Sequence, residues 1–424
     1  MFEKVSGLFF IVSRLTYLKR QTRSLPDKWI TVGGGDAVKK RKKIDWWILG
    51  PYLTLSMIGL LEVYSASSYR LLQADENTKS LLLRQLIFIF LSWGVIFLAR
   101  SIKLHYLLHP KIAGYGLALS IFFLILVRVG IFGVTVNCAQ RWISLFGIQF
   151  QPSELANLFL IFYLSWFFRD GNNPPKNLKK PFLITVSITL LILFQPKIAG
   201  ALMILSIAWV IFWAAAVPFK KGIYLIVTFS ALLIGAAGGV LYLGNKGWLP
   251  QMFNHAYERI ATLRDPFIDS HGAGYQMTHS FYALYNGGIW GRGLGNSITK
   301  KGYLPETETD FIFSIITEEL GLIGALCVLF LLFSLCMRIF CLSSRCKNQQ
   351  AGLFLLGFGT LLFVQTIMNV GSIAGLMPMT GVPLPFVSYG GTSYLILSLG
   401  IGITLNISSK IQAEELPLYR PEKQ

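Results

Sequence analysis

The sequence predicts an all-α integral membrane protein with about ten transmembrane helices. Hydrophobic residues make up 54% of the 424 residues and charged residues only 14%, whereas soluble domains carry roughly 25% charged residues. The mean hydropathy is +0.57. Long apolar runs also alternate with short basic stretches along the whole chain, which is typical of a multi-pass membrane protein.

Ten apolar runs are the predicted transmembrane helices, with boundaries uncertain by a few residues. They cover residues 46–64, 86–99, 112–131, 154–168, 181–195, 201–217, 222–243, 311–337, 351–370 and 391–408. We therefore expect a membrane domain at 46–408 between a basic cytoplasmic tail (1–45) and a cytoplasmic C-terminal tail (409–424). The first tail lacks the features of a cleavable signal peptide. Its apolar stripe from Val5 to Leu15 fits either an interfacial amphipathic helix or a disordered tail.

The charges between the runs predict the orientation. With the N-terminal tail inside, every inner loop is basic: the inner-loop cations are Arg100, Lys103 and Lys111; Arg169, Lys176, Lys179 and Lys180; Lys220 and Lys221; and Arg338, Arg345 and Lys347. The long loop 244–310 between helices 7 and 8 then lies outside, with six basic and six acidic residues. The net charge of +18 thus follows the positive-inside rule. This placement argues against a nucleic-acid interface.

Two outer loops are unusual. Loop 244–310 is long and mixes glycines, aromatics and balanced charge, and long structured loops usually carry function. Loop 371–390 is rich in glycine and proline at the edge of the membrane. Irregular backbone at that depth requires protein or water to satisfy its polar groups. We therefore expect the outer face to be the working face.

Four stretches carry a family resemblance. They are Ala139-Gln-Arg-Trp-Ile-Ser with Phe150-Gln-Pro-Ser-Glu-Leu; Gly274-Tyr-Gln with Asn286-Gly-Gly and Gly291-Arg-Gly-Leu-Gly-Asn-Ser; Tyr303-Leu-Pro-Glu with Thr309-Asp-Phe-Ile-Phe and Glu318-Glu-Leu-Gly; and Pro378-Met-Thr-Gly-Val-Pro-Leu-Pro-Phe-Val-Ser-Tyr-Gly-Gly. Together with the ten-helix pattern, they resemble the SEDS family (shape, elongation, division and sporulation) over roughly residues 44–410. Within the family, the chain is more similar to the division member than to the elongation member.

The resemblance implies an activity. SEDS proteins polymerise lipid II, an undecaprenyl-diphosphate-linked disaccharide-pentapeptide, into peptidoglycan strands, and they act with a class B penicillin-binding protein that crosslinks the product. It also implies a bacterial plasma-membrane protein with both termini in the cytoplasm, placed at the division septum among other divisome membrane proteins. The sequence shows no cofactor motif and no metal-ligand spacing, although a divalent cation at the diphosphate is compatible with it.

Asp310 is the candidate catalytic residue, because the resemblance places the family's catalytic aspartate in the Thr309-Asp-Phe stretch. A general base could take the proton from the acceptor sugar hydroxyl. On pattern alone, Thr307-x-x-Asp310 before an apolar run also fits a helix capping box. Many family members have histidine where this chain has Glu308. Glu318 and Glu319 lie inside an apolar run, where we expect them to be paired.

Four further residues are candidates for substrate binding: Arg141, Glu154, Lys197 and Arg259. The two arginines fall in outer loops and suit either bidentate diphosphate contact or packing against aromatics. Glu154 fits either a first-turn capping role or an active-site role. Lys197 could support the diphosphate or extend to the outer interface.

Two positions depart from the family pattern. Asn157 stands where a lysine is usual, and Lys197 where an aspartate is usual. If Asn157 and Lys197 line one cavity, Lys197 supplies the positive charge that the usual lysine at position 157 would have provided. Because these departures could alter activity, two other functions stay open: a lipid II flippase, and a non-catalytic division scaffold. The position of the motifs at the outer face favours the enzyme.

Overall fold

The computed structural model describes residues 44–129, 133–136, 139–145, 148–170, 178–195, 197–215 and 274–415, together with short pieces between 227 and 267. Within these ranges the chain is predominantly helical. The apolar stripe predicted in the N-terminal tail and most of the seventh predicted run (222–243) lie outside the described residues.

The other nine predicted runs coincide with described helices. The helices are α2 (Trp46–Gln73), α3 (Ser80–Ser101), α4 (Leu104–Leu107), α5 (Pro110–Val129), α6 (Pro152–Phe167), α7 (Lys179–Leu193), α8 (Ile198–Ala214), α11 (Tyr275–Gly287), α12 (Ile312–Arg345), α13 (Gln349–Ile373) and α14 (Gly391–Glu415). Among the described residues, six spans are long and apolar enough to cross a membrane, and Ile198–Ala214 is a shorter apolar helix. This confirms the predicted class.

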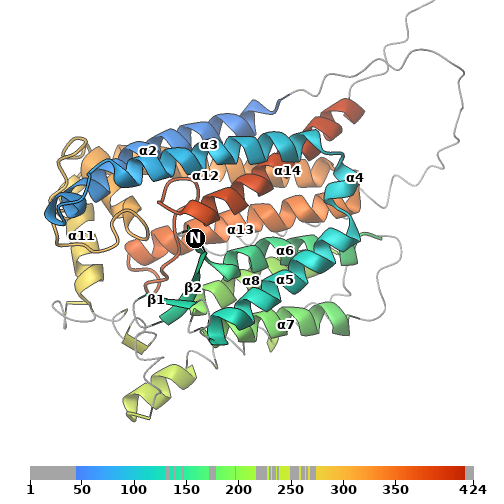
Figure 1. Cartoon of the computed structure of the whole chain (residues 1–424), viewed down its shortest axis with the longest axis horizontal. Coiled ribbons are helices and arrows are strands. Elements are labelled where there is room, and N and C mark those ends of the chain that lie inside the picture. Colours follow the sequence, from blue (N-terminus) through green and yellow to red (C-terminus); the bar gives the residue numbers. More distant parts are fainter. Residues whose placement is uncertain are drawn as a thin grey trace, which may run out of the picture.

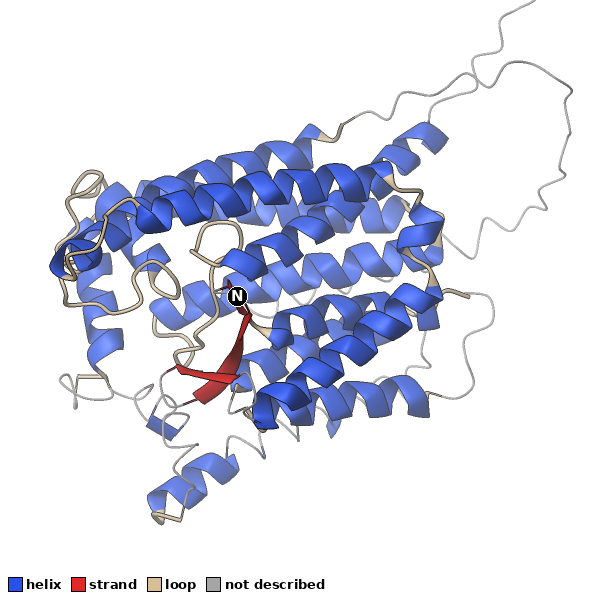
Figure 2. Cartoon of the chain, in the orientation of Figure 1, coloured by secondary structure: helices blue, strands red, loops and turns tan. Residues whose placement is uncertain are grey.

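The long helices run roughly along one common direction (Figures 1 and 2). In Figure 1, α2, α3, α12 and α14 lie in the upper part of the bundle, and α5, α6, α7 and α8 in the lower part. Helix α13 contacts α6 and α8 as well as α12, so it joins the two groups. Helices α13 and α14 are also the most enclosed of the long spans, with 78% and 83% of their most apolar windows buried inside the protein. These two helices form the centre of the fold.

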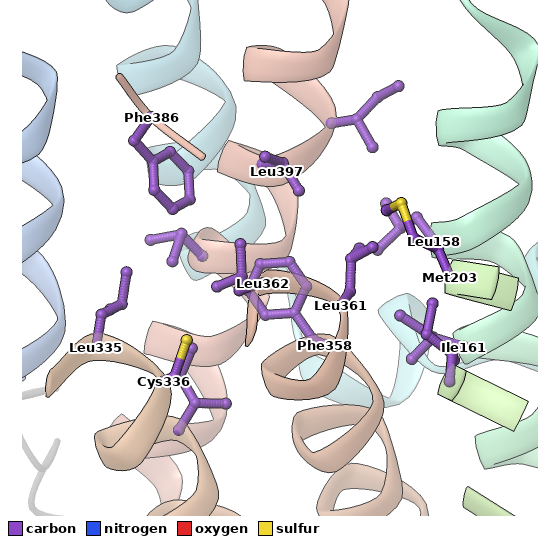
Figure 3. Packing of buried hydrophobic residues seen from close by; sticks show 14 of the residues in the cluster. Leu158, Ile161, Met203, Leu335, Cys336, Phe358, Leu361, Leu362, Phe386 and Leu397 are labelled. Atoms are coloured by element: carbon purple, nitrogen blue, oxygen red, sulfur yellow. The ribbon is translucent and has the colours of Figure 1, made fainter. Parts of the chain in front are cut away.

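The core between the two groups is apolar and closely packed. Figure 3 shows Phe358, Leu361 and Leu362 of α13 between Leu335 and Cys336 of α12 on one side and the α6 and α8 side chains on the other. Phe358 is fully buried. Burial of such side chains in a dense interior makes the helix positions sensitive to single methylene changes.

At one end of the bundle, the buried carboxylate of Asp45 joins three helices. Asp45 caps α2 by accepting a hydrogen bond from the backbone of Trp47. Its Oδ2 also accepts hydrogen bonds from Arg338 of α12 (2.7 Å) and Ser408 of α14 (2.7 Å). The start of α2 is therefore tied to the ends of two other helices.

The opposite end carries two elements that the sequence did not predict. A three-stranded antiparallel sheet, β1 (Gly133–Val136), β2 (Ala139–Leu145) and β3 (Ile148–Phe150), precedes α6. Helix α11 lies inside the predicted loop 244–310 and crosses the end of the bundle (Figure 1). Both elements are short, and α11 is far less apolar than the membrane spans, so neither stands out beside the long apolar runs.

Helix α12 breaks near its start, at Gly321, which has φ 71° and ψ −172°. A Cβ there would lie 2.3 Å from the carbonyl oxygen of Ile289, so only glycine fits. The gap accepts the loop after α11: Leu322 N–H donates to the Gly288 carbonyl (2.9 Å), and Arg292 N–H donates to the Glu318 carbonyl (3.0 Å). The Glu-Glu-Leu-Gly stretch is therefore where the outer loop docks on α12.

Candidate functional site

Asp310 lies immediately before α12, in a turn with a partly exposed side chain. The helix begins at Ile312, and its N-cap residue, Phe311, makes no side-chain capping bond. The capping-box interpretation of Thr307 and Asp310 is therefore wrong. The Thr307 hydroxyl instead donates to the Ala66 carbonyl of α2 (3.2 Å). Thr307 is therefore not the N-cap of α12, which the sequence pattern alone could not decide.

Helix α2 supports one side of this segment. Glu308 is buried and forms an ion pair with Arg70, whose side chain is 59% exposed. The Thr307 hydroxyl also lies 3.2 Å from a Glu308 carboxylate oxygen. The carboxylate that replaces the usual family histidine is therefore neutralised by an arginine at the end of α2.

The chain between α13 and α14 supports the other side. Residues 374–390 are not helical, yet Leu384 and Ser388 are buried there. Ser388 Oγ donates to the Thr309 carbonyl (2.6 Å). The backbone N–H of Tyr389 donates to the Glu308 carbonyl (2.8 Å). We expect the polar groups of this irregular loop to need hydrogen-bond partners from protein or water. The segment that carries Asp310 supplies some of these partners.

Asn369, near the end of α13, completes this contact. Its Nδ2 donates to the carbonyls of Asp310 (2.9 Å) and Val382 (2.8 Å). Val382 and the next residue, Pro383, line a cavity in the interior. One buried amide therefore connects the Asp310 backbone to the cavity wall.

That cavity brings together three of the residues singled out in the sequence: Glu154 and Asn157 of α6, and Lys197 immediately before α8. Gln365 of α13 and Ser393 of α14 also line it. The two positions that depart from the family pattern thus share one cavity, as the relocation hypothesis requires.

Lys197 is buried, with 8% of its surface exposed, and its ammonium donates to Ser153 Oγ (3.1 Å). The alternative that Lys197 extends to the outer interface is wrong, because its side chain is buried and bonds Ser153 of α6. Its charge attracts the Glu154 carboxylate. Glu154 Oε2 and Asn157 Oδ1 are buried and accept no hydrogen bond in the described structure. The cavity wall therefore has hydrogen-bonding capacity to spare.

A second buried cluster joins α12 to the outer loop. Lys300 pairs with Glu319 (2.8 Å), and Ser65 of α2 donates to both oxygens of the same carboxylate. Glu318 accepts hydrogen bonds from the hydroxyls of Ser297 and Thr299. The prediction that these intramembrane acids are paired is confirmed for Glu319, whose cation is Lys300, whereas the described donors to Glu318 are neutral hydroxyl, amide and backbone groups.

The structure describes no side-chain contacts for the two candidate arginines. The Arg141 backbone belongs to β2, where the register with β1 shifts between Val134 and Thr135; nothing is described of its side chain. Arg259 lies outside the described residues. Their assignment to the diphosphate stays a prediction.

Asn369, Ser388 and Arg70 contact the Asp310 segment, and the sequence analysis gave none of them a role. Ser388 was visible only as part of the Pro-Phe-Val-Ser-Tyr-Gly-Gly stretch. Asn369 is a polar residue inside an apolar run, which is a usable signal in a membrane protein. Arg70 had no distinguishing pattern.

Comparison with known proteins agrees with this arrangement. Residues 46–413 match the model of the FtsW, RodA and SpoVE family, described as cell cycle proteins. The chain belongs to this family. It is 63% identical over 389 residues to a probable peptidoglycan glycosyltransferase FtsW of Enterococcus hirae, covering 90% of this chain and 98% of the relative. It is 31% identical to the corresponding Bacillus subtilis protein, covering 89% and 93%.

Solved structures of the family share the fold. One is a chain of a peptidoglycan synthase complex in which polymerization and crosslinking are coordinated; it aligns with a TM-score of 0.67 at 26% identity, covering 87% of this chain and 98% of that one. Another is the rod shape determining protein RodA of Thermus thermophilus, with a TM-score of 0.61 at 25% identity, covering 86% and 96%. The membrane architecture described above is therefore that of the family.

Proposed function

We propose that this chain is a peptidoglycan glycosyltransferase that polymerises lipid II into glycan strands during cell division, with Asp310 as the general base. The observation that carries the proposal is the setting of Asp310: a partly exposed acid at the end of the bundle, in the turn just before α12 begins. The backbone of its segment is fixed between α2 and the loop before α14. The similarity to relatives named peptidoglycan glycosyltransferases supports the same reaction.

In this reaction the Asp310 carboxylate takes the proton from the acceptor sugar hydroxyl. The hydroxyl oxygen attacks the anomeric carbon of the donor, a new glycosidic bond forms, and the bond to the diphosphate breaks. The lipid diphosphate leaves with its negative charge. A positioned base contributes typically about 10²–10⁴-fold, and cations near the leaving group contribute electrostatically.

Glu154, Lys197, Arg141 and Arg259 are the proposed substrate-binding residues. Lys197 shares its cavity with Glu154, so part of its charge is already balanced there. We propose that the positive charge of Lys197 offsets the negative charge of Glu154, so that this wall of the cavity does not repel the diphosphate. The two arginines are proposed to contact the diphosphate itself. A divalent cation there is compatible with this scheme.

The proposal includes an orientation and a partner. The end of the bundle that carries α11 and Asp310 faces outward and both tails face the cytoplasm, as the basic loops predict. A class B penicillin-binding protein at the division septum crosslinks the product, alongside other divisome membrane proteins. The fold similarity to a chain of a synthase complex supports such a partner. Cysteine tags near Gly302, but not near Asn348, should react with impermeant reagents on intact cells.

The decisive experiment is polymerisation of purified lipid II by the purified protein with its class B penicillin-binding protein. Asp310→Asn and Asp310→Ala should both abolish polymer while the protein inserts and purifies normally, because the base requires a carboxylate. Near-normal polymer from Asp310→Asn would refute the base role. Lipid II translocation by a wild-type protein that makes no polymer would favour a flippase instead.

A further inference from the structure

Three consecutive backbone carbonyls around Asp310 accept hydrogen bonds from α13 and from the loop before α14. The carbonyl of Glu308 accepts from Tyr389 N–H (2.8 Å), that of Thr309 from Ser388 Oγ (2.6 Å), and that of Asp310 from Asn369 Nδ2 (2.9 Å). Regular secondary structure does not fix this stretch, because α12 begins only at Ile312. Its position is set by turn hydrogen bonds to the Glu306 carbonyl, by these three contacts and by those to α2.

The two side-chain donors are themselves fixed. Ser388 is 3% exposed and Asn369 is 1% exposed. Ser388 Oγ also accepts a hydrogen bond from Leu384 N–H (2.7 Å). The same hydroxyl therefore bonds within the loop before α14 and to the Thr309 carbonyl. Asn369 spans the Asp310 and Val382 carbonyls. Neither side chain can move away without leaving a buried polar group unpaired.

We infer that Ser388 and Asn369 are positioning residues for the Asp310 carboxylate. This inference rests on the proposed function. Proton transfer requires the base within about 2.6–3.2 Å of the hydroxyl, and a displacement of about 1 Å can slow a reaction by about 100-fold. Ser388 and Asn369 set that distance through the backbone and do not touch the substrate themselves.

The same geometry joins two parts of the site. Val382 lies on the cavity wall that includes Glu154 and Lys197, and Asn369 bonds both Val382 and Asp310. Asn369 therefore links the base to one edge of the cavity, whereas Glu154 and Lys197 take no part in these hydrogen bonds. A loss of positioning at this loop should appear in the rate of the chemical step before it appears in substrate affinity.

The test compares Ser388→Ala and Asn369→Leu with the wild type, and with Ser120→Ala as the matched control. Ser120 is also a fully buried serine, but its hydroxyl bonds only within α5, to Gly116. For each purified protein with its class B penicillin-binding protein, the initial polymerisation rate at saturating lipid II, the binding of labelled lipid II and the thermal unfolding midpoint are measured.

We expect both variants to remain folded, with midpoints below that of Ser120→Ala because buried polar groups lose their partners. We expect them to lose about 100-fold in rate at saturating lipid II, with unchanged lipid II binding. Ser388→Thr, which keeps the hydroxyl, should recover most of the rate. Should Ser388→Ala unfold, Asn369→Leu and Ser388→Thr decide the question. A normal rate in a folded Asn369→Leu or Ser388→Ala protein overturns the inference, as does a parallel loss of rate and binding that Ser388→Thr does not repair.

Asp310→Asn is run alongside to separate the two claims. If Asp310→Asn loses polymerisation while the Ser388 and Asn369 variants keep it, only the positioning inference fails. If Asp310→Asn keeps polymerisation, the proposed base itself fails.

Discussion

Two buried lysine–glutamate sites in this protein differ in how completely they are satisfied. Lys300 bonds Glu319 and Ser65 at 2.8 Å each, and both Glu319 oxygens have further donors. Lys197 bonds Ser153, but the neighbouring Glu154 keeps a buried oxygen without a donor. Glu154 and Lys197 also line a cavity.

The difference separates structure from function. A fully satisfied buried network fixes the chain and has nothing left to bind. A buried polar group without a partner is costly and calls for a reason, such as a role toward a ligand. We therefore assign the Lys300 cluster to docking the outer loop on α12, and the Lys197 cavity to the proposed substrate site. Three predictions test this assignment.

The largest effect is expected from Lys300→Met. It leaves the Glu319 carboxylate buried without its cation, and removing one partner of a buried pair typically costs about 3–5 kcal/mol. The free energy of unfolding, measured by titration with denaturing detergent in mixed micelles, should fall by about that amount. Lys301→Met is the matched control, because the Lys301 side chain is exposed, and it should leave stability unchanged. Equal stability of the two variants would remove the structural role of Lys300.

A smaller effect, seen in activity rather than stability, is expected at the cavity. Lys197→Asp places a second acid beside Glu154 and should slow lipid II polymerisation at least about tenfold. Adding Asn157→Lys returns a cation to the same cavity and should restore much of the rate, with a coupling of about 1–3 kcal/mol between the sites. Asn157→Lys alone provides the fourth corner of the cycle. Additive effects, or full activity in Lys197→Asp, would end the relocation hypothesis.

The smallest effect is expected at Glu62 of α2. Both of its carboxylate oxygens are buried and unpartnered, and it lies close enough to Glu319 and Lys300 to interact with their charges. Glu62→Gln keeps the shape and removes an unpaired acid, so stability should be unchanged or higher by at most about 1 kcal/mol. Glu319→Gln, in the satisfied network, should instead be clearly destabilised. A loss in Glu62→Gln as large as that in Lys300→Met would show that Glu62 balances Lys300.

Much of the fold could be predicted because it depends on local composition. Nine of the ten apolar runs coincide with described helices, since a span of apolar residues is favourable in a bilayer whatever its neighbours are. The pairing of Glu319 was also predictable, because an isolated charge in the membrane is costly. The sheet before α6 and helix α11 were not predicted, because both are short and neither contains a long apolar run.

Some residues of the site could be predicted from the sequence, but their arrangement could not. The motifs indicate Asp310, Glu154 and Lys197, but they could not show whether Thr307 and Asp310 form a helix capping box. Only the start of α12 at Ile312 decided against the capping box, and only the contact with Ser153 of α6 showed that Lys197 points inward.

The sequence by itself therefore determined the membrane class, the positions of most helices and the family, because each depends on residues close together in the chain. The tertiary structure decided which polar groups meet. Ser388 is 79 residues from Thr309, Asn369 is 59 from Asp310, and Lys197 is 44 from Ser153. Contacts over such separations exist only once α13 has packed between α12 and the α6–α8 group, so their partners cannot be read from local pattern.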